Sequence, residues 1–287
     1  MGDKRAVRFY PFRRPVEMQA AGRLEAQNSQ GILTRIGASV LYGLEILGQS
    51  VNWALRTLGS FGEIPKRAGL ILDEMVRIGT SSLFISSFLA FFVGMVLVVQ
   101  TADQLEGYPQ EVLGSIVGLS MTKELGPVLM AFLLAGRAGS AMAAELAAMQ
   151  VYEEIAALRT LDIRVESYLI LPKFIATALT LPLLILYADI IGILAGAFAV
   201  AIDPAIHVSV NAYFHNLQAY LKFSDIITGM VKGLVFGAVT AILSCTIGLR
   251  ARRGTEEISN ATTSAVVWSF ITVTVFDYII ARIVLIF

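Results

Sequence analysis

Four charged side chains lie in or beside a long apolar stretch, where lipid would make an unpaired charge costly. They are Lys123 and Glu124 near its start, Arg137 in its middle and Glu145 toward its end. Ionisable residues within membranes usually line a path or form pairs, and Pro127 predicts a bend or break beside Glu124. Glu124 is interpreted as lining a cavity, as being neutralised by Lys123 or Arg137 in a static bundle, or as both. For Arg137 and Glu145, interfacial anchoring or a salt bridge is favoured.

The same stretch could contribute to a lipid site together with the apolar segment that precedes it. A headgroup needs a few polar groups and acyl chains need an apolar wall. The loop at residues 102–111 is short, so it makes the two segments neighbours. We therefore predict a lipid-binding cavity toward the outer ends of these segments, lined by Val96, Val99, Gln100, Lys123, Glu124 and Leu125.

The chain offers little for catalysis of its own. No lysine is followed by Ser or Thr, which excludes a Walker A lysine, and no Gly-x-Ser-x-Gly motif is present. Cys245 is the sole cysteine, and His207 and His215 make a poor metal site. We therefore expect no catalytic residues, no metal and no cofactor in this chain. Asp277 is expected to pair with Arg282 or to reach the outer surface.

Composition indicates an all-α integral membrane protein with a single domain over residues 31–287. Of the 287 residues, 56% are hydrophobic and 15% are charged, whereas soluble domains average about 25% charged residues. Residues 1–30 are expected to be a cytoplasmic tail. Residues 31–60 repeat apolar positions every three or four residues, which predicts an amphipathic helix in the interface, and residues 63–78 repeat that pattern. The alternative is a soluble helical hairpin packed on the bundle.

Five apolar stretches are predicted to cross the membrane, at about 80–101, 113–149, 168–201, 226–249 and 262–287. As one straight helix the second would be about 56 Å long, so it must bend, tilt or protrude. Small residues at four-residue spacing predict close helix packing. The clearest examples are Ala135, Gly139 and Ala143 in the second stretch and Gly229, Gly233 and Gly237 in the fourth.

The distribution of positive charge predicts the orientation. Loops with Arg159, Arg164 and Arg250 to Arg253 belong on the cytoplasmic side, whereas residues 102–111 and 203–221 lack Lys and Arg and belong outside. The N-terminus is then cytoplasmic and the C-terminus lies outside. A polar segment between the third and fourth spans is expected to form a helix on the outer side.

Residues 150–162 are predicted to form a short cytoplasmic helix with an apolar edge at Val151, Ile155 and Leu158. Glu153, Glu154 and Arg159 flank that edge. A solvated loop helix would explain the charges. If nothing else in the chain covers the apolar edge, however, that edge indicates a surface that binds a partner.

The sequence from about Ile32 onward resembles the permease family typified by MlaE and YrbE. The resemblance rests on Lys123-Glu124-Leu125-Gly126-Pro127, Ala135-Gly136-Arg137-Ala138-Gly139-Ser140, Ala144-Glu145-Leu146, Glu153 to Leu158, Leu181 to Leu184 and Ala261 to Val267. The chain departs from the pattern at residues 161–165, where Leu-Asp-Ile-Arg-Val replaces Met-Gly-Val-Asp-Pro.

The resemblance implies a homodimer in the bacterial inner membrane that serves an ABC transporter for phospholipid. Its implied partners are a cytoplasmic ATPase that binds ATP and Mg, an outer-side protein with an MCE domain and a STAS-domain protein; nucleic acid is not expected. The ATPase would contact the helix at residues 150–162 through Glu153, Glu154, Ile155, Leu158 and Arg159. Two other classes stay open, a membrane-embedded lipid-modifying enzyme and a structural membrane scaffold.

Overall fold

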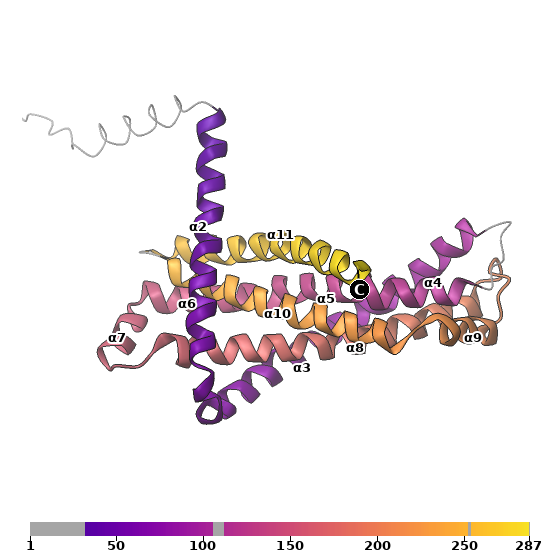
Figure 1. Cartoon of the computed structure of the whole chain (residues 1–287), viewed down its shortest axis with the longest axis horizontal. Helices are drawn as coiled ribbons and strands as arrows, with labels where there is room; N and C mark the ends of the chain where they lie inside the picture. The colour runs from indigo at the N-terminus through magenta and orange to yellow at the C-terminus, as the bar shows by residue number, and fades with distance from the viewer. Residues whose placement is uncertain (1–31, 106–111, 252–253, 287) are drawn as a thin grey trace, which may run out of the picture. The chain divides into compact units, whose positions relative to one another are not determined.

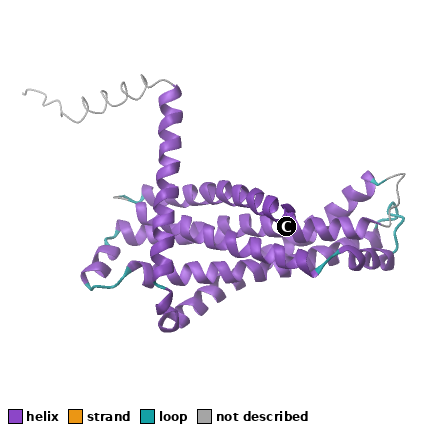
Figure 2. Ribbon diagram, in the orientation of Figure 1, coloured by secondary structure: helices purple, strands orange, loops and turns teal. Residues whose placement is uncertain are grey.

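The computed structural model describes residues 32–105, 112–251 and 254–286, and over these ranges it is helical, with short connections and no strand (Figure 2). The predicted tail, most of the first outer loop, Arg252 and Arg253 lie outside the described residues. The chain divides into two compact units, Met1–Leu47 and Gly48–Phe287. The second unit holds five helices that are long and apolar enough to cross a membrane, which confirms the predicted fold class.

Two helices open the described chain. The predicted amphipathic helix is present as α2 (Ile32–Gly59), and a single 3-10 turn, η1 (Phe61–Glu63), leads into α3 (Ile64–Gln104). Pro65 occupies the first turn of α3, where its missing N–H leaves no helical bond unmade. The 41 residues of α3 continue without interruption, so the structure corrects the boundary predicted between a helix at 63–78 and the first span.

The second apolar stretch is one long helical path, Leu113–Val151, with two π-helical turns in it. Its parts are α4 (Leu113–Ser120), η3 (Met121–Leu125), α5 (Gly126–Leu134), η4 (Ala135–Gly139) and α6 (Ser140–Val151). Of the bend or break predicted at Gly126–Pro127, the break does not occur, since the helical path continues through both residues. The π-turn η3 precedes Pro127 and accommodates it, since the wider turn relaxes the i−4 hydrogen-bond pattern that proline disrupts.

After α6 the chain forms the short helix α7 (Glu154–Thr160) and then η5 (Glu166–Ile170), which runs into α8 (Leu171–Ile202). The predicted helix between the third and fourth spans is α9 (Val210–Tyr220), whose first turn is capped by Ser209. The last two helices are α10 (Phe223–Arg250) and α11 (Glu256–Ile286). Within the second unit, α7 lies at one end of the bundle and α4 with α9 at the other (Figure 1).

Small residues let the helices of the second unit approach backbone to backbone. A Cβ atom on Gly94 of α3 would lie 2.1 Å from the carbonyl oxygen of Gly192 in α8, and one on Gly237 of α10 would lie 2.6 Å from that of Thr177. These contacts place α8 between α3 and α10. The resulting core is made largely of alanine and leucine side chains from α5, α6, α8 and α10.

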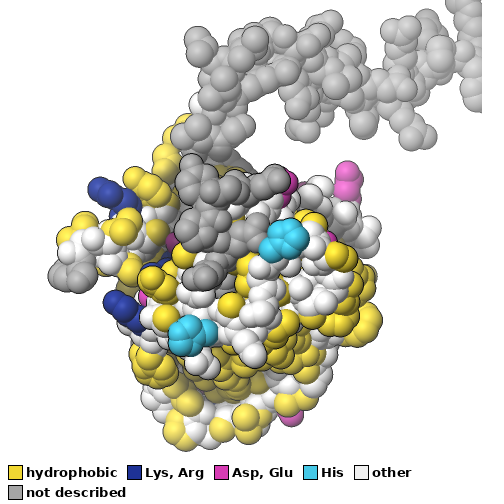
Figure 3. Space-filling view, turned by 90° about the vertical axis from the view of Figure 1, so that its right-hand side faces the viewer, with side chains coloured by type: hydrophobic (Ala, Val, Ile, Leu, Met, Phe, Trp, Pro, Cys, Tyr) yellow, Lys and Arg dark blue, Asp and Glu magenta, His cyan; other side chains and the backbone are white. Residues whose placement is uncertain are grey.

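The end of the second unit formed by α4 and α9 has its own apolar cluster around the buried Tyr213. The Tyr213 hydroxyl donates a hydrogen bond to the Ile193 carbonyl over 3.3 Å. Burial raises the pKa of the Tyr213 phenol, so the phenol stays a neutral donor. Figure 3 looks onto this end, where apolar and histidine side chains are prominent.

Candidate functional site

A fully buried lysine inside α10 organises the main charged site. Lys232 is 1% exposed, and its ammonium nitrogen lies 2.7 Å from a Glu124 carboxylate oxygen and 2.8 Å from one of Asp277. These groups come from η3, α10 and α11, so the site ties three helices together. A buried ammonium group is tolerated only where opposite charges and hydrogen bonds compensate its lost hydration, and this site supplies both.

The third contact of Lys232 explains why the site forms beside Pro127. The ammonium group donates a hydrogen bond over 2.9 Å to the backbone carbonyl of Lys123. Lys123 lies four residues before Pro127, which has no N–H to donate to that carbonyl. Lys232 therefore replaces the helical hydrogen bond that the proline removes, and it does so from a different helix.

A second ion pair extends the site toward the start of α10. The Lys123 ammonium group lies 2.9 Å from Asp225, whose other carboxylate oxygen accepts a hydrogen bond from the Lys222 backbone N–H. Lys123, Glu124, Asp225, Lys232 and Asp277 thus form one network, which we call the Lys232 network. Its two cations and three carboxylates leave it with one net negative charge.

The Lys232 network lies within the apolar helices and still reaches the surface of the chain. Glu124 is about 16 Å along the helix from Leu113, and Lys232 is about 14 Å from the start of α10. The Glu124 side chain is nevertheless 50% exposed, while that of Asp277 is 20% exposed. Polar groups inside the apolar bundle are thus exposed on this face, which suits the binding of a polar headgroup rather than an acyl chain.

Two predicted pairings are wrong. Glu124 is neutralised by Lys232 of α10, not by Lys123 or Arg137, and Asp277 pairs with Lys232 instead of Arg282. Sequence reasoning overlooked Lys232 altogether. The available signal was its position, because it is the sole lysine or arginine among residues 226–249 of the predicted fourth span.

The six residues predicted to line a lipid cavity fall into two groups. Lys123, Glu124 and Leu125 form the π-turn η3, and the first two belong to the Lys232 network. Val96, Val99 and Gln100 lie on an exposed face of α3. Val99 also lines a cavity of about 240 Å³ that has Asp103, Asp203 and His207 in its wall.

A short helix is present within residues 150–162 as α7, but its apolar edge faces the bundle. Ile155 is 1% exposed and packs against Leu146, Val165 and Ile242, with Leu158 beside them. The stripe is therefore covered by the chain itself, and its interpretation as an open partner surface is wrong. The outward side of α7 instead carries Glu153, Glu154 and Arg159, which are exposed, with Tyr152 and Leu161 at its ends.

The small residues predicted to pack helices lie at tight contacts. A Cβ atom on Gly229 would lie 2.5 Å from the Thr122 carbonyl oxygen in η3, and Gly233 and Gly237 are similarly close to α8. Ala135 and Ala143 are buried, and a Cβ atom on Gly139 would lie 2.9 Å from the Ser244 hydroxyl. The Gly229 contact brings α10 against η3, and so positions Lys232 one turn later.

Comparison of the sequence with known proteins shows the family to which the chain belongs. The family model described as Permease MlaE matches residues 71–283, which includes α4 to α10 and most of α3 and α11. This chain belongs to the MlaE permease family. It is a multi-pass membrane protein, and its family identifies it as a transport permease.

Relatives in the MlaE permease family come from bacteria and from a chloroplast. A probable ABC transporter permease protein of Rickettsia typhi is 34% identical over 252 residues, covering 88% of this chain and 96% of the relative. The intermembrane phospholipid transport system permease protein MlaE of Haemophilus influenzae is 31% identical over 253 residues, with the same coverage. The chloroplastic protein TRIGALACTOSYLDIACYLGLYCEROL 1 of Arabidopsis thaliana is 34% identical over 212 residues, covering 73% of this chain and 60% of the relative.

Proposed function

We propose that this chain is the permease subunit of an ABC transporter that moves phospholipid, or a related lipid, between the inner and outer membranes. A cytoplasmic partner ATPase would drive it, and the chain itself would catalyse no reaction. The observation that carries the proposal is the Lys232 network, since Lys123 and Glu124 present charge to the exterior from within an apolar bundle. The name of the Haemophilus relative supports phospholipid as the cargo.

The geometry suggests how an ATPase could act on the lipid site. The helical path Leu113–Val151 carries Lys123 and Glu124 near its start and leads directly to α7 at its end. From Glu124 to Val151 the path rises about 40 Å, so it spans most of the membrane. A displacement of α7 by the ATPase would move the same helix that holds the headgroup ligands.

The contact with the ATPase would use the charged outward side of α7. Glu153, Glu154 and Arg159 are exposed there, whereas Ile155 anchors the helix to the core. A rigidly anchored helix can transmit a push, because the buried side chain resists sliding. An ATPase bound to α7 would put α7 and the N-terminus on the cytoplasmic side of the membrane and the C-terminus on the outer side.

The remaining partners are proposed from the family resemblance. A second copy of the chain would cover the exposed part of Glu124 and close a lipid cavity between the two η3 turns. An outer-side protein with an MCE domain would receive or deliver lipid, and a STAS-domain protein would bind on the cytoplasmic side. An enzyme that modifies lipids would need a nucleophile or metal set, and a scaffold would not need a charged network within the bundle.

Transport is tested by reconstituting the chain with its ATPase in vesicles and following ATP-dependent transfer of a fluorescent phospholipid. Glu124→Gln removes the exposed charge but keeps an acceptor for Lys232, so the fold should survive. We expect transfer to fall by roughly tenfold, the equivalent of about 1.4 kcal/mol of headgroup binding. Lys66→Gln removes an exposed charge elsewhere and should leave transfer unchanged. Normal transfer by Glu124→Gln would contradict the proposed role of the network.

A further inference from the structure

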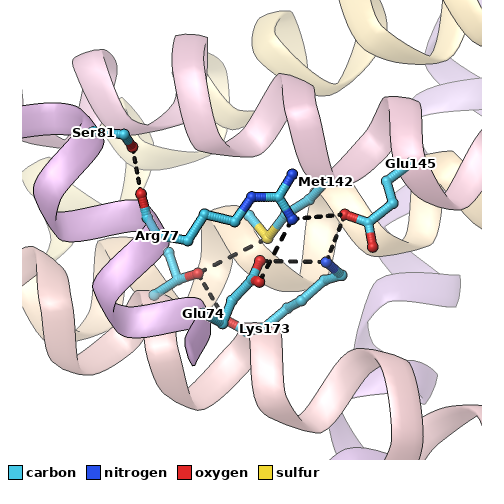
Figure 4. Close-up of polar contacts among 7 residues, drawn as sticks. Glu74, Arg77, Ser81, Met142, Glu145 and Lys173 are labelled. Atoms are coloured by element: carbon cyan, nitrogen blue, oxygen red, sulfur yellow. Dashed lines mark hydrogen bonds and ion pairs between the residues drawn. The ribbon is translucent and has the colours of Figure 1, made fainter. Parts of the chain in front are cut away.

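A second group of charges lies where α3, α6 and α8 meet, toward the α7 end of the bundle. Lys173 of α8 lies 2.9 Å from a carboxylate oxygen of Glu145 and 3.3 Å from one of Glu74, and its side chain is 7% exposed. Figure 4 shows both carboxylates turned toward Lys173, with Arg77 reaching over them from α3. The buried lysine is thereby neutralised by two carboxylates that it holds in place.

Arg77 has no comparably close contact with these carboxylates. Its guanidinium nitrogen lies 3.6 Å from Glu145 and 3.9 Å from Glu74, which is beyond hydrogen-bond distance, and its side chain is 66% exposed. Lys173 already engages one oxygen of each carboxylate. Arg77 therefore keeps most of its donors available.

A second guanidinium group borders the same space. Arg137 of η4 and Arg77 both line a cavity of about 220 Å³, together with Glu74 and Glu145. Among the described residues, one terminal nitrogen of Arg137 is buried without any hydrogen-bond partner. A buried donor without an acceptor costs free energy, so an acceptor in the cavity that this nitrogen reached by a small shift of the Arg137 side chain would be stabilising.

The charge of the cavity selects the acceptor. In its wall, Arg77 and Arg137 balance Glu74 and Glu145. Lys173 pairs with both carboxylates without lining the cavity, so the group as a whole has one positive charge and the two guanidinium groups are not needed to neutralise the carboxylates. Guanidinium forks match the geometry of phosphate and carboxylate oxygens. The occupant that the cavity favours is therefore an anion with at least two oxygen acceptors.

The surface beside the cavity indicates where that anion comes from. Ser81 and Ala141 at its rim are exposed. The next turns of α3 on the Ser81 side carry exposed Phe84, Ile85 and Phe88. Residues three, four and seven positions onward share one helix face, so an apolar strip leads away from the cavity along α3. A phosphate joined to acyl chains would match both the charges and the strip.

We propose that this cavity binds the phosphate group of an anionic phospholipid through Arg77 and Arg137, with the acyl chains along the α3 strip. The site is separate from the Lys232 network and is made by other residues. Its occupancy goes beyond the proposed transport function and does not require transport, because binding can be measured without the ATPase and without ATP. The failure of either proposal therefore leaves the other intact.

The test measures lipid retained by the full chain in nanodiscs of phosphatidylcholine containing a minor fraction of phosphatidylglycerol, by native mass spectrometry. Arg77→Gln and Arg137→Gln should each weaken phosphatidylglycerol retention by roughly tenfold or more, as expected for the loss of a charge-assisted contact. Arg137→Lys should retain part of the binding. Glu145→Gln raises the net positive charge and keeps an acceptor for Lys173, so retention should rise.

Lys66→Gln is the matched control, because Lys66 is an exposed cation on the same helix outside the cavity. An equal loss of phosphatidylglycerol retention in Lys66→Gln would show general surface attraction and would overturn the site. Unchanged retention in both arginine variants would also overturn it.

Inorganic phosphate is added to detergent-solubilised protein as a second arm. Binding of phosphate there with no preference for the lipid would assign the cavity to a free anion. Unchanged lipid retention with an altered dimer fraction in the arginine variants would assign it to a second copy.

Discussion

Replacing Lys232 with methionine tests whether the buried lysine holds η3, α10 and α11 together. Methionine has a similar length and keeps the apolar packing of the stem, so the change removes mainly the charge. It leaves the Asp277 carboxylate, which is 20% exposed, without its cation, and it leaves the Lys123 carbonyl without its donor. The perturbation is thus confined to the three contacts of one ammonium group.

The expected size of the effect follows from those contacts. Removing one partner of a buried ion pair costs about 3–5 kcal/mol. Glu124 is half exposed and can regain hydration, which reduces the loss. We therefore expect Lys232→Met to lower the free energy of unfolding by about 3 kcal/mol, at the lower end of that range. Asp277→Asn leaves Lys232 with Glu124 and the carbonyl, and should cost about 1–2 kcal/mol.

The assay is equilibrium unfolding in mixed micelles of a mild detergent and sodium dodecyl sulfate, followed by helical circular dichroism. The double variant Lys232→Met with Asp277→Asn should lose less than the sum of the single losses, since the carboxylate left unpaired is removed as well. Lys66→Met on the exposed side of α3 is the control and should change stability by less than about 0.5 kcal/mol. If Lys232→Met behaves like that control, or the double variant is strictly additive, the network does not join the helices.

Three further predictions address coupling, orientation and packing. The purified chain should hydrolyse no ATP, and Glu154→Lys should abolish stimulation of the partner ATPase without reducing helix content; normal stimulation would exclude the outward side of α7 as the contact. A cysteine at Asn211 should react with a membrane-impermeant reagent in intact cells, whereas one at Thr255 should react only after permeabilisation, and the reverse pattern would invert the orientation. Gly237→Ala places a Cβ atom 2.6 Å from a backbone oxygen and should lower the free energy of unfolding by about 1–3 kcal/mol, while Gly69→Ala, with open space around it, should not.

The existence of the helices could be predicted from the sequence, because hydropathy and apolar period depend on neighbouring residues. Boundaries were less predictable where one helix continues from a polar to an apolar stretch. Residues 63–78 carry enough charge to suggest a separate interfacial helix, yet only Gly79 separates them from the first span, and a single glycine inside a helix is tolerated. Of the bend or break predicted beside Pro127, the break does not occur, because a π-turn and a lysine from another helix satisfy the backbone there.

The charged partners could not be read from the sequence, because they are distant along the chain. Glu124 and Lys232 are separated by 108 residues, and helix packing such as that of Gly229 against η3 brings them together. The apolar edge of α7 was misjudged for the same reason. Its apolar edge looks uncovered locally, whereas Val165 and Ile242 come from later segments to cover Ile155.

Photo-crosslinking of lipid tests the central claim, that the face around η3 binds phospholipid, most directly. A photoreactive amino acid is placed at Leu125 in η3, at Val96 on α3, or at Val267 on α11. Val96 and Val267 are matched in exposure at 50% and 49%, so ordinary surrounding lipid should label them alike. We predict that Leu125 and Val96 capture radiolabelled phospholipid in the assembled complex and that Val267 captures much less. Equal capture at all three positions would show surrounding lipid only and would contradict a defined lipid site.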